Sequence, residues 1–312
     1  MHPAKSIIVF TTLSGAGYGL LFLLALGALA GLLPPSPWFG GVALAVALGL
    51  AGIGLVSSLL HLGHPERAWR ALSQWRTSWL SREGVLALLS FLPALAFAWG
   101  WLLQGRIWLA AAVPLLLLAA ATVYSTAMIY GSLKTIRQWH HPLVPPLYLL
   151  YALATGGCLL VALLAGFGER GHEATFVAAL ATVGAWVMKL RYWRDIDGGR
   201  SIATPESATG LGALGKVRLL EPPHSEENYL LREMGYQVAR KHAAKLRKLA
   251  AIAALLLPLG CLVVLLATGS GWWDLPLGLV AALGALAGTL TERWLFFAEA
   301  THTVVLFYGR QA

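Results

Sequence analysis

The chain alternates between long apolar segments and shorter polar ones. About 20 consecutive apolar residues in a helix cross a hydrocarbon core of roughly 30 Å, and eight segments of the sequence reach that length. They predict membrane-spanning helices at residues 7–33, 39–60, 84–103, 107–130, 144–167, 174–190, 249–268 and 275–297. The segments lack the alternation of apolar and polar positions that marks a strand, so the expected fold class is an all-α bundle and not a barrel.

The composition supports an integral membrane protein. Of the 312 residues, 58% are hydrophobic and only 12% are charged, whereas soluble globular proteins carry roughly 25% charged residues. We expect one membrane anchor domain over residues 1–312, with a long loop at residues 191–248 between the sixth and seventh spans. The first span contains a cleavage-like Ala-Leu-Ala at residues 28–30. Its apolar run is longer than that of a secretory signal, so we expect it to be retained as a helix.

The basic residues give the expected orientation. With eight spans, both termini share a side with the loops after the even-numbered spans, and that side holds 20 of the 23 Lys and Arg residues, including twelve from Lys189 to Lys248. The opposite side holds Arg106 and Arg170, and Arg293 falls within the last span. Because basic loops stay in the cytoplasm, we expect cytoplasmic termini in the bacterial inner membrane. The net charge of +9 then reflects membrane orientation and does not indicate a nucleic-acid partner.

The long loop divides into two parts. Its first part, RDIDGGRSIATPESATGLGALGK, is rich in Gly, Ser and Thr and predicts irregular structure. Its second part, PPHSEENYLLREMGYQVARKHAAKLRKL, predicts a helix that begins near Ser225 and continues into the seventh span. Docking of a partner subunit and a simple solvated loop are both compatible with this pattern.

Titratable and polar side chains gather at the cytoplasmic ends of the spans. His61 and His64 close the second span, Glu83 opens the third, Tyr130 closes the fourth and Glu292 lies late in the eighth. Such groups are costly in a membrane and usually belong to a pathway or a site. His61 and Glu83 lie on adjacent antiparallel helices at similar depth, so an imidazole and a carboxylate could together move protons to or from a bound hydroquinone.

Each of these positions also has a structural interpretation. His64 could cap a helix end at the membrane interface. Arg67, Arg70, Arg76 and Arg82 could be positive-inside anchors, or they could dock a partner. On the last span, Glu292, Glu299 and His302 recur at intervals of seven and three, which predicts a polar stripe that faces the bundle.

The sequence argues against metal centres within this chain. Histidines are lacking in the middle of the spans, where a bis-histidine haem b would need them. The two cysteines, Cys158 and Cys261, lie inside apolar spans without CxxC spacing, whereas an iron–sulfur cluster needs about four thiolates. We therefore expect no metal ligands here.

Three motifs carry a family resemblance. LLHLGHPERAW, SWLSREG and the polar final span TERWLFFAEATHTVVLFYG resemble the dimethyl sulfoxide reductase anchor subunits, the DmsC-like family. The long insert TPESATGLGALGKVRLLEPPHSEENYLLREMGYQ resembles a branch of that family attached to cytoplasmic enzymes, which includes the anchor of quinone-dependent sulfite dehydrogenase.

The resemblance implies a heterotrimer. A molybdopterin-containing catalytic subunit and a four-cluster iron–sulfur subunit would sit on the membrane, and this chain would anchor them among the lipids and exchange electrons with the quinone pool, either ubiquinone or menaquinone. The histidine of the H-L-G motif and the glutamate of the S-x-E motif are implicated at the quinone site of the family. Those positions are His61 and Glu83. Tyr130, His64 and Glu292 are further candidates because of their place at the cytoplasmic ends of the spans, and the resemblance does not assign them.

The orientation distinguishes members of this family. If the charged loops are cytoplasmic, the catalytic subunits dock in the cytoplasm, which favours sulfite oxidation coupled to quinone reduction. An anchor of dimethyl sulfoxide reductase or of another oxide reductase that oxidises quinol is the alternative. A proton-coupled transporter is a remoter alternative, because no inverted repeat is evident.

Overall fold

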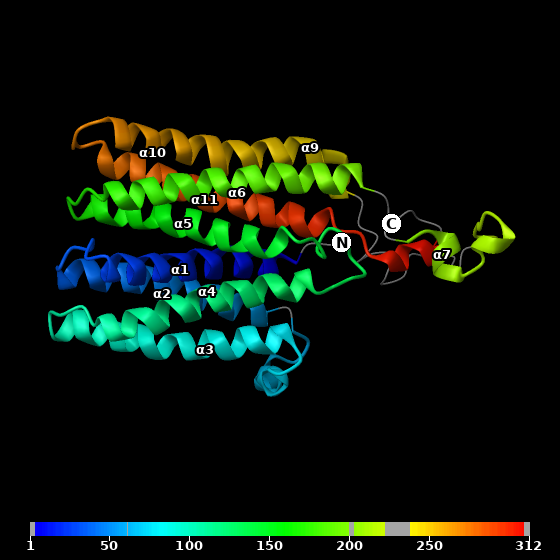
Figure 1. Cartoon of the computed structure of the whole chain (residues 1–312), viewed down its shortest axis with the longest axis horizontal. Helices are drawn as coiled ribbons and strands as arrows, with labels where there is room; N and C mark the ends of the chain where they lie inside the picture. The colour runs from blue at the N-terminus through cyan, green and yellow to red at the C-terminus, as the bar shows by residue number, and fades with distance from the viewer. Residues whose placement is uncertain (1–3, 61, 200–202, 222–237, 309–312) are drawn as a thin grey trace.

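The computed structural model describes residues 4–60, 62–199, 203–221 and 238–308, most of which form a bundle of long helices (Figure 1). Within the described residues, 8 helices are long and apolar enough to cross a membrane, which confirms the expected all-α fold. They are α1 (Lys5–Leu29), α2 (Pro37–Leu59), α3 (Trp79–Ala98) with the π-helical turn η2 (Trp99–Leu103), α4 (Leu109–Gly131), α5 (Val144–Gly166), α6 (His172–Gly198), α9 (Val238–Ala251) continuing through the π-helical turn η4 (Ile252–Leu256) into α10 (Leu257–Ala267), and α11 (Asp274–Ala298).

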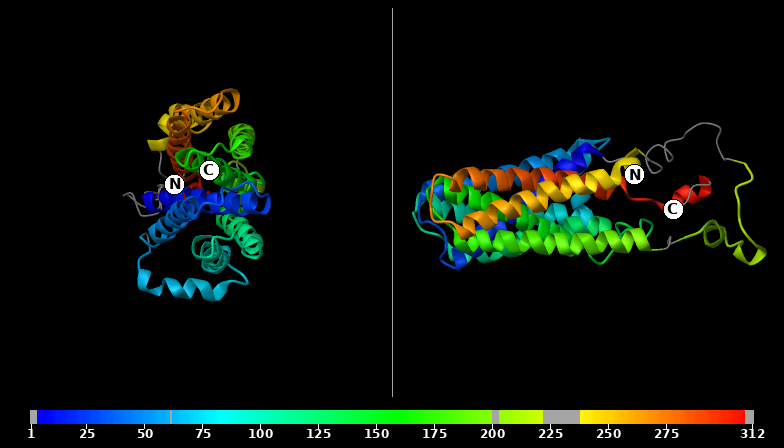
Figure 2. Two further views of the ribbon diagram at one scale, coloured as in Figure 1. Left: turned by 90° about the vertical axis from the view of Figure 1, so that its left-hand side faces the viewer. Right: turned by 90° about the horizontal axis from the view of Figure 1, so that it is seen from above.

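Both described ends of the chain lie at one end of the bundle, where α1 begins and α11 ends (Figure 1). We call this the terminal end. The 3₁₀ helix η1 (Pro65–Gln74) connects α2 to α3 there and lies across the spanning helices (Figure 2). Three short elements, α7 (Pro205–Thr209), η3 (Gly212–Leu214) and η5 (Thr303–Tyr308), also lie beyond the bundle at this end (Figure 1).

The segment around the long loop is more helical than expected. α6 continues past the predicted end of the sixth span at Leu190 and stops only at Gly198. The intervening residues, RYWRDID, tolerate a helix, and the Gly198–Gly199 pair ends it. At the other side of the loop, α9 runs directly into the seventh span, as the sequence predicts. The expected start of that helix near Ser225 lies outside the described residues.

The two helices α1 and α5 form the centre of the bundle. In each, 72% of the most apolar window is buried, against 33–44% in the other spanning helices. A Cβ atom at Gly19 of α1 would overlap the carbonyl group of Ala152 of α5, and one at Gly156 of α5 would overlap the backbone at Gly19. Small residues thus let these helices approach closely, which is a common basis of helix association in membranes.

The outer faces of the bundle are apolar. Ile53 and Val56 on α2, Leu92 on α3 and Leu180 on α6 are each more than half exposed. A row of exposed aliphatic side chains would be a liability in water, but it suits a surface that contacts acyl chains.

Because α1 and α5 lie so close together, adding one methyl group at Gly19 should lower the stability of the protein. We expect Gly19→Ala to destabilise the protein by about 1–3 kcal/mol, because the helices must separate to accommodate the added Cβ. Thermal unfolding in mild detergent measures the effect. Gly52→Ala on α2 is the matched control, since a Cβ there meets no atom within 4 Å. Equal unfolding temperatures for the two variants would contradict this account of the packing.

Candidate functional site

Glu83 is buried in the first half of α3, near the terminal end. Its residue is 4% exposed, and the Thr126 hydroxyl of α4 donates a hydrogen bond to its Oε1 atom. The same hydroxyl contacts the Thr122 carbonyl at 3.1 Å, which fixes the Thr126 rotamer. From α1, Tyr18 lies within electrostatic range of Glu83 and accepts a hydrogen bond from Ser90 at 3.4 Å. Three helices therefore surround this carboxyl group.

The joint between η1 and α3 packs directly beside Glu83. A Cβ atom at Gly84 would lie 2.8 Å from Leu72 of η1, so the two elements touch. Arg82 donates hydrogen bonds to the carbonyls of Trp75 at 3.0 Å and Arg76 at 2.7 Å. Arg82, expected as a docking residue, thus also holds the turn that leads into α3.

The two histidines expected at the site have different outcomes. His61 lies outside the described residues, so its position relative to Glu83 stays a prediction. His64 is exposed, and its Nδ1 atom lies 3.0 Å from Oε1 of Glu66. The Nε atom of Arg67 lies 3.6 Å from the same carboxylate oxygen. His64 and Arg67 therefore form a small surface ion group and do not face the buried carboxyl group of Glu83.

The remaining docking candidates are exposed and lie beside tryptophans. Arg70 lies over the ring of Trp69 at 5.5 Å, and Arg76 lies over the ring of Trp75 at 5.4 Å. Trp69 and Trp75 are themselves exposed. Such an arginine and tryptophan surface suits the membrane interface or a protein partner.

Tyr130 belongs to an aromatic cluster at the end of α4. Its ring contacts Trp139 and Phe297 with centroids 5.2 Å away, and it stacks on Tyr148 at 6.1 Å. Tyr130 is 8% exposed and lies within electrostatic range of Glu83. The cluster closes the terminal end of the bundle between α4, α5 and α11, and it places a phenol close to the carboxyl group of Glu83.

Glu292 is the centre of a buried ion triad. Lys189 of α6 places its Nζ atom 2.5 Å from Oε1 of Glu292, and Arg293 places its Nη1 atom 3.4 Å from Oε2. The side chains of Lys189 and Glu292 are 1% exposed, and that of Arg293 is 3% exposed. The guanidinium group of Arg293 lies 3.6 Å from the ring centroid of Tyr148. Two basic side chains thus share one acidic partner inside the bundle.

A second ion group lies further toward the terminal end. Arg247 of α9 contacts Asp197 of α6 at 2.5 Å and Glu299, just after α11, at 2.8 Å. Glu299 follows Glu292 by seven residues, which is about two helical turns, so both lie on one face. The expected polar stripe therefore faces neighbouring helices of the bundle, first α6 and then α9.

His141 lies in the connection between α4 and α5, near the end of α6. Its Nδ1 atom accepts a hydrogen bond from the backbone N–H of Leu143 at 3.2 Å, and its Nε2 atom lies 3.6 Å from Asp195. Burial lowers the pKa of His141 below its ordinary value; the Asp195 carboxylate acts to raise this pKa, and the neighbouring cations act to lower it. The ring of His141 contacts Tyr192 with centroids 5.3 Å apart, so it packs the α4–α5 connection against α6.

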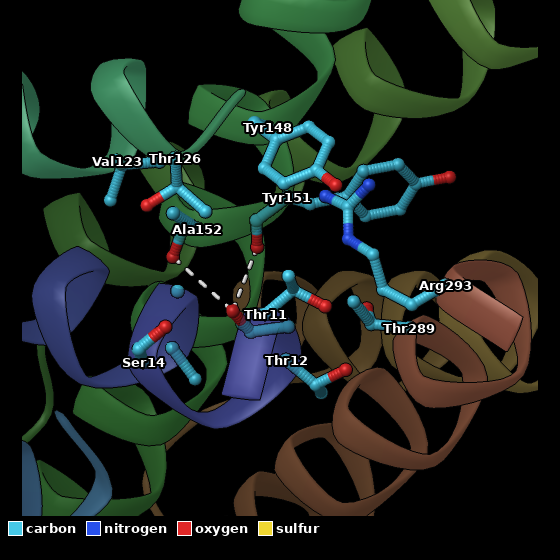
Figure 3. Close-up of a pocket in the computed structure, with 13 residues that line it drawn as sticks. Thr11, Thr12, Ser14, Val123, Thr126, Tyr148, Tyr151, Ala152, Thr289 and Arg293 are labelled. Atoms are coloured by element: carbon cyan, nitrogen blue, oxygen red, sulfur yellow. Dashed lines mark hydrogen bonds between the residues drawn. The ribbon is translucent and has the colours of Figure 1, made fainter. Parts of the chain in front are cut away.

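A small polar cavity connects the surroundings of Glu83 with the triad (Figure 3). Thr126, the partner of Glu83, lines one part of it, and Arg293, the partner of Glu292, lines another. Its volume is about 10 Å³, which is enough for roughly one water molecule and too small for a quinone ring. Hydroxyl groups dominate its wall, namely those of Thr11, Thr12, Ser14, Thr126, Tyr148, Tyr151, Thr155 and Thr289.

Sequence reasoning missed most of this buried network. By sequence alone, Lys189 belongs to the basic cytoplasmic side and Arg293 is a polar group late in the last span, next to Glu292. Neither is predicted to contact Glu292, and both do. Thr126 has no distinguishing signal in an apolar helix. A basic residue inside a predicted span is the signal that could have identified Lys189 and Arg293, because such residues seek a counter-ion.

These features define a polytopic helical membrane protein with a buried ionisable cluster in the half of the bundle near the terminal end. The family model described as DMSO reductase anchor subunit (DmsC) matches residues 1–310, so the chain belongs to that family and is a membrane anchor subunit of an oxidoreductase complex. The family expected from the sequence motifs is confirmed.

Two characterised relatives resemble the chain. It is 35% identical to the C subunit of the sulfite dehydrogenase of Allochromatium vinosum over 99% of both proteins. It is 29% identical to the corresponding C component of the anaerobic dimethyl sulfoxide reductase of Escherichia coli over 45% of each protein. The first similarity therefore includes all eight spanning helices, while the second covers less than half of the sequence.

The triad predicts unequal effects of its two partners. We expect Glu292→Gln to destabilise the protein by about 3–5 kcal/mol, since it leaves the permanently charged Arg293 buried without a carboxylate and removes the partner of Lys189. Lys189→Met should cost less, because Glu292 and Arg293 still compensate each other. Thermal unfolding of the purified protein in detergent tests this order. A larger loss of thermal stability for Lys189→Met than for Glu292→Gln would contradict this account of how Glu292 compensates the two basic side chains.

Proposed function

We propose that this chain anchors a molybdopterin-containing catalytic subunit and a four-cluster iron–sulfur subunit to the bacterial inner membrane and transfers their electrons to quinone. Sulfite is the substrate of the complex. The observation that carries this proposal is the 35% identity over nearly the full length to the C subunit of a sulfite dehydrogenase. The family match over residues 1–310 argues against the proton-coupled transporter.

The distribution of charge supports cytoplasmic docking. The terminal end of the bundle carries the exposed arginines of η1 and the Asp197–Arg247–Glu299 group. Among the described residues, Arg106 and Arg170 are the lysine or arginine side chains at the opposite end. By the positive-inside rule the terminal end faces the cytoplasm. Catalytic partners docked there would oxidise a cytoplasmic substrate. This orientation is the reason to prefer sulfite oxidation over dimethyl sulfoxide reduction, for which the similarity covers 45% of the sequence.

The side chains around Glu83 have the chemistry that quinone reduction requires. A quinone takes up two electrons and two protons when it is reduced, and a buried carboxyl group can hydrogen-bond its oxygen and hold one of the protons. The cavity between Thr126 and Arg293 is too small for the ring. We therefore propose that the quinone binds on the other side of Glu83, toward η1, with His61 as a further candidate ligand from the sequence.

The residues at the proposed quinone site have separate roles. Glu83 holds a proton beside the quinone oxygen, and Thr126 orients the carboxyl group through its hydrogen bond. The aromatic cluster around Tyr130 keeps bulk water away from this carboxyl group. The anchor makes no bond to sulfite, because that chemistry belongs to the catalytic subunit.

Purification of the intact complex tests the substrate. We expect this chain to co-purify in mild detergent with two subunits that contain molybdenum and iron–sulfur clusters, and the complex to reduce a ubiquinone analogue when sulfite is added. Quinol-dependent reduction of dimethyl sulfoxide without sulfite activity would favour the alternative. A protein that purifies alone and stable would contradict the anchoring of these partners.

Substitutions at the quinone site should separate two activities. We expect Glu83→Gln and His61→Ala to lower sulfite-dependent quinone reduction by about 10²-fold or more, because a group that transfers protons is lost. Sulfite-dependent reduction of an artificial dye at the partner subunits should remain nearly intact. Glu169→Gln, which removes an exposed carboxylate at the opposite end of the bundle, is the matched control and should keep both activities. Full quinone activity in Glu83→Gln would remove Glu83 from the site.

A further inference from the structure

Four ionisable side chains in this half of the bundle are almost fully buried. Glu83, Lys189, Glu292 and Arg293 are each at most 4% exposed. Because arginine stays protonated in proteins, their formal charges sum to zero only when both acids and both bases are ionised, or when one acid and Lys189 are both neutral. A proton added to Glu83 alone would leave one uncompensated positive charge in a medium that solvates ions poorly. The protonation of Glu83 must therefore be linked to the charge of the triad.

Only one member of the triad can readily release a proton to restore neutrality. Arginine keeps its proton in proteins, whereas a buried lysine can become neutral. Glu292 compensates Arg293 in either case. Hence the four side chains have two neutral states, one with Glu83 ionised and Lys189 charged, and one with Glu83 protonated and Lys189 neutral. The two states differ in the position of one proton, which lies on Lys189 in the first and on Glu83 in the second.

The cavity supplies a physical connection between them. Among the residues that the structure describes, the hydroxyls of Thr12, Tyr148, Tyr151 and Thr289 have no hydrogen-bond partner, and all four line this cavity. Its volume admits about one water molecule, and such a water would find several polar partners there. Figure 3 shows Thr126 on one side of Tyr148 and the guanidinium group of Arg293 on the other.

Tyr148 lies between Thr126 and the Arg293 guanidinium group in the wall of the cavity (Figure 3). It is within electrostatic range of Glu83, Glu292 and Arg293, and its ring lies under the Arg293 guanidinium group. Its phenol can accept a proton at one lone pair while it releases its own. The cavity wall therefore runs from Arg293, which contacts Glu292 of the triad, past Tyr148 to Thr126, which donates a hydrogen bond to Glu83.

We propose that Lys189 is the internal proton donor that recharges Glu83 through the hydrated cavity lined by Tyr148 and Thr126. The proposal rests on the quinone-reducing function inferred above. Glu83 first gives its proton to the quinone, which is reduced by two electrons from the iron–sulfur partner. The cluster is then one negative charge in excess, and neutral Lys189 takes up a proton from the terminal end. The ammonium proton of Lys189 next passes to Glu83, and Lys189 is neutral again. Each quinol formed requires two such cycles.

The outer ion group marks where the proton enters. Glu299 lies within electrostatic range of Lys189, and its side chain is 10% exposed. It follows Glu292 on the same helix face, about two turns closer to the terminal end. A proton that reaches Lys189 therefore has a carboxylate on its way from water into the bundle.

Two substitutions at Lys189 should move the Glu83 proton in opposite directions. Lys189→Met removes a charge, so neutrality requires protonated Glu83. Lys189→Arg keeps a permanent charge, so neutrality requires ionised Glu83. In the complex purified in detergent, we expect the infrared band of a protonated buried carboxyl group, assigned by its loss in Glu83→Gln, to persist in Lys189→Met and to vanish in Lys189→Arg. Lys245→Met and Lys245→Arg, on α9 outside the triad, should leave the band as in the wild type.

Turnover supplies the second readout. Both Lys189 variants should lower sulfite-dependent quinone reduction at least tenfold while dye reduction at the partner subunits is retained. A Glu83 band that is the same in Lys189→Met, Lys189→Arg and wild type, or full quinone turnover in Lys189→Met, would overturn the proposal. The infrared measurement needs neither quinone nor sulfite. If the proposed function is wrong, the wild-type complex will not reduce quinone with sulfite. If only the role of Lys189 is wrong, the wild-type complex will do so and the Glu83 band will not respond to the Lys189 substitutions.

Discussion

The ion triad around Glu292 is the interaction on which the terminal half of the bundle depends. A charge buried among apolar helices is tolerated only with a counter-ion at close range, and Glu292 meets that requirement for Lys189 and Arg293 together. The pairing ties α6 to α11. Because Arg293 also covers the ring of Tyr148, it ties α11 to α5. Contacts with lipid alone would not fix the positions of α5, α6 and α11 along one another. The contacts of Glu292 and Arg293 therefore set how these three helices are aligned.

The small residues of α1 complete this arrangement. Gly19 and Gly156 let α1 and α5 touch through their backbones, which brings the hydroxyls of Thr11, Thr12 and Ser14 to the wall of the polar cavity. Larger side chains at the contact would separate the helices and open the region to lipid. The packing of the central pair and the polarity of the cavity are therefore consequences of the same close approach.

The arrangement suits an anchor subunit that must handle protons near one membrane surface. Glu83, the triad and the outer ion group all lie in the half of the bundle nearest the terminal end, and the described core of the other half is mainly apolar. A proton therefore has a short distance to travel between water and the buried carboxyl group. The exposed arginine and tryptophan side chains of η1 lie at the same end, close to where partner subunits would dock.

The periodicity of apolar segments was sufficient to predict the eight spans, because a helix must satisfy its own backbone in lipid and its length is set by the membrane. The motifs around His61 and Glu83 were sufficient to predict the family, and the burial of Glu83 and Tyr130 agrees with the polar end expected from the sequence. Sequence position could not show that Lys189 points into the bundle or that Thr126 contacts Glu83. Side chains of a helix point in all directions around its axis, and the packing of neighbouring helices decides which of them are buried. The sequence by itself thus determined the fold class, the family and the polar end of the bundle. The tertiary structure decided which charges compensate one another, because that depends on the distances between helices far apart in the chain.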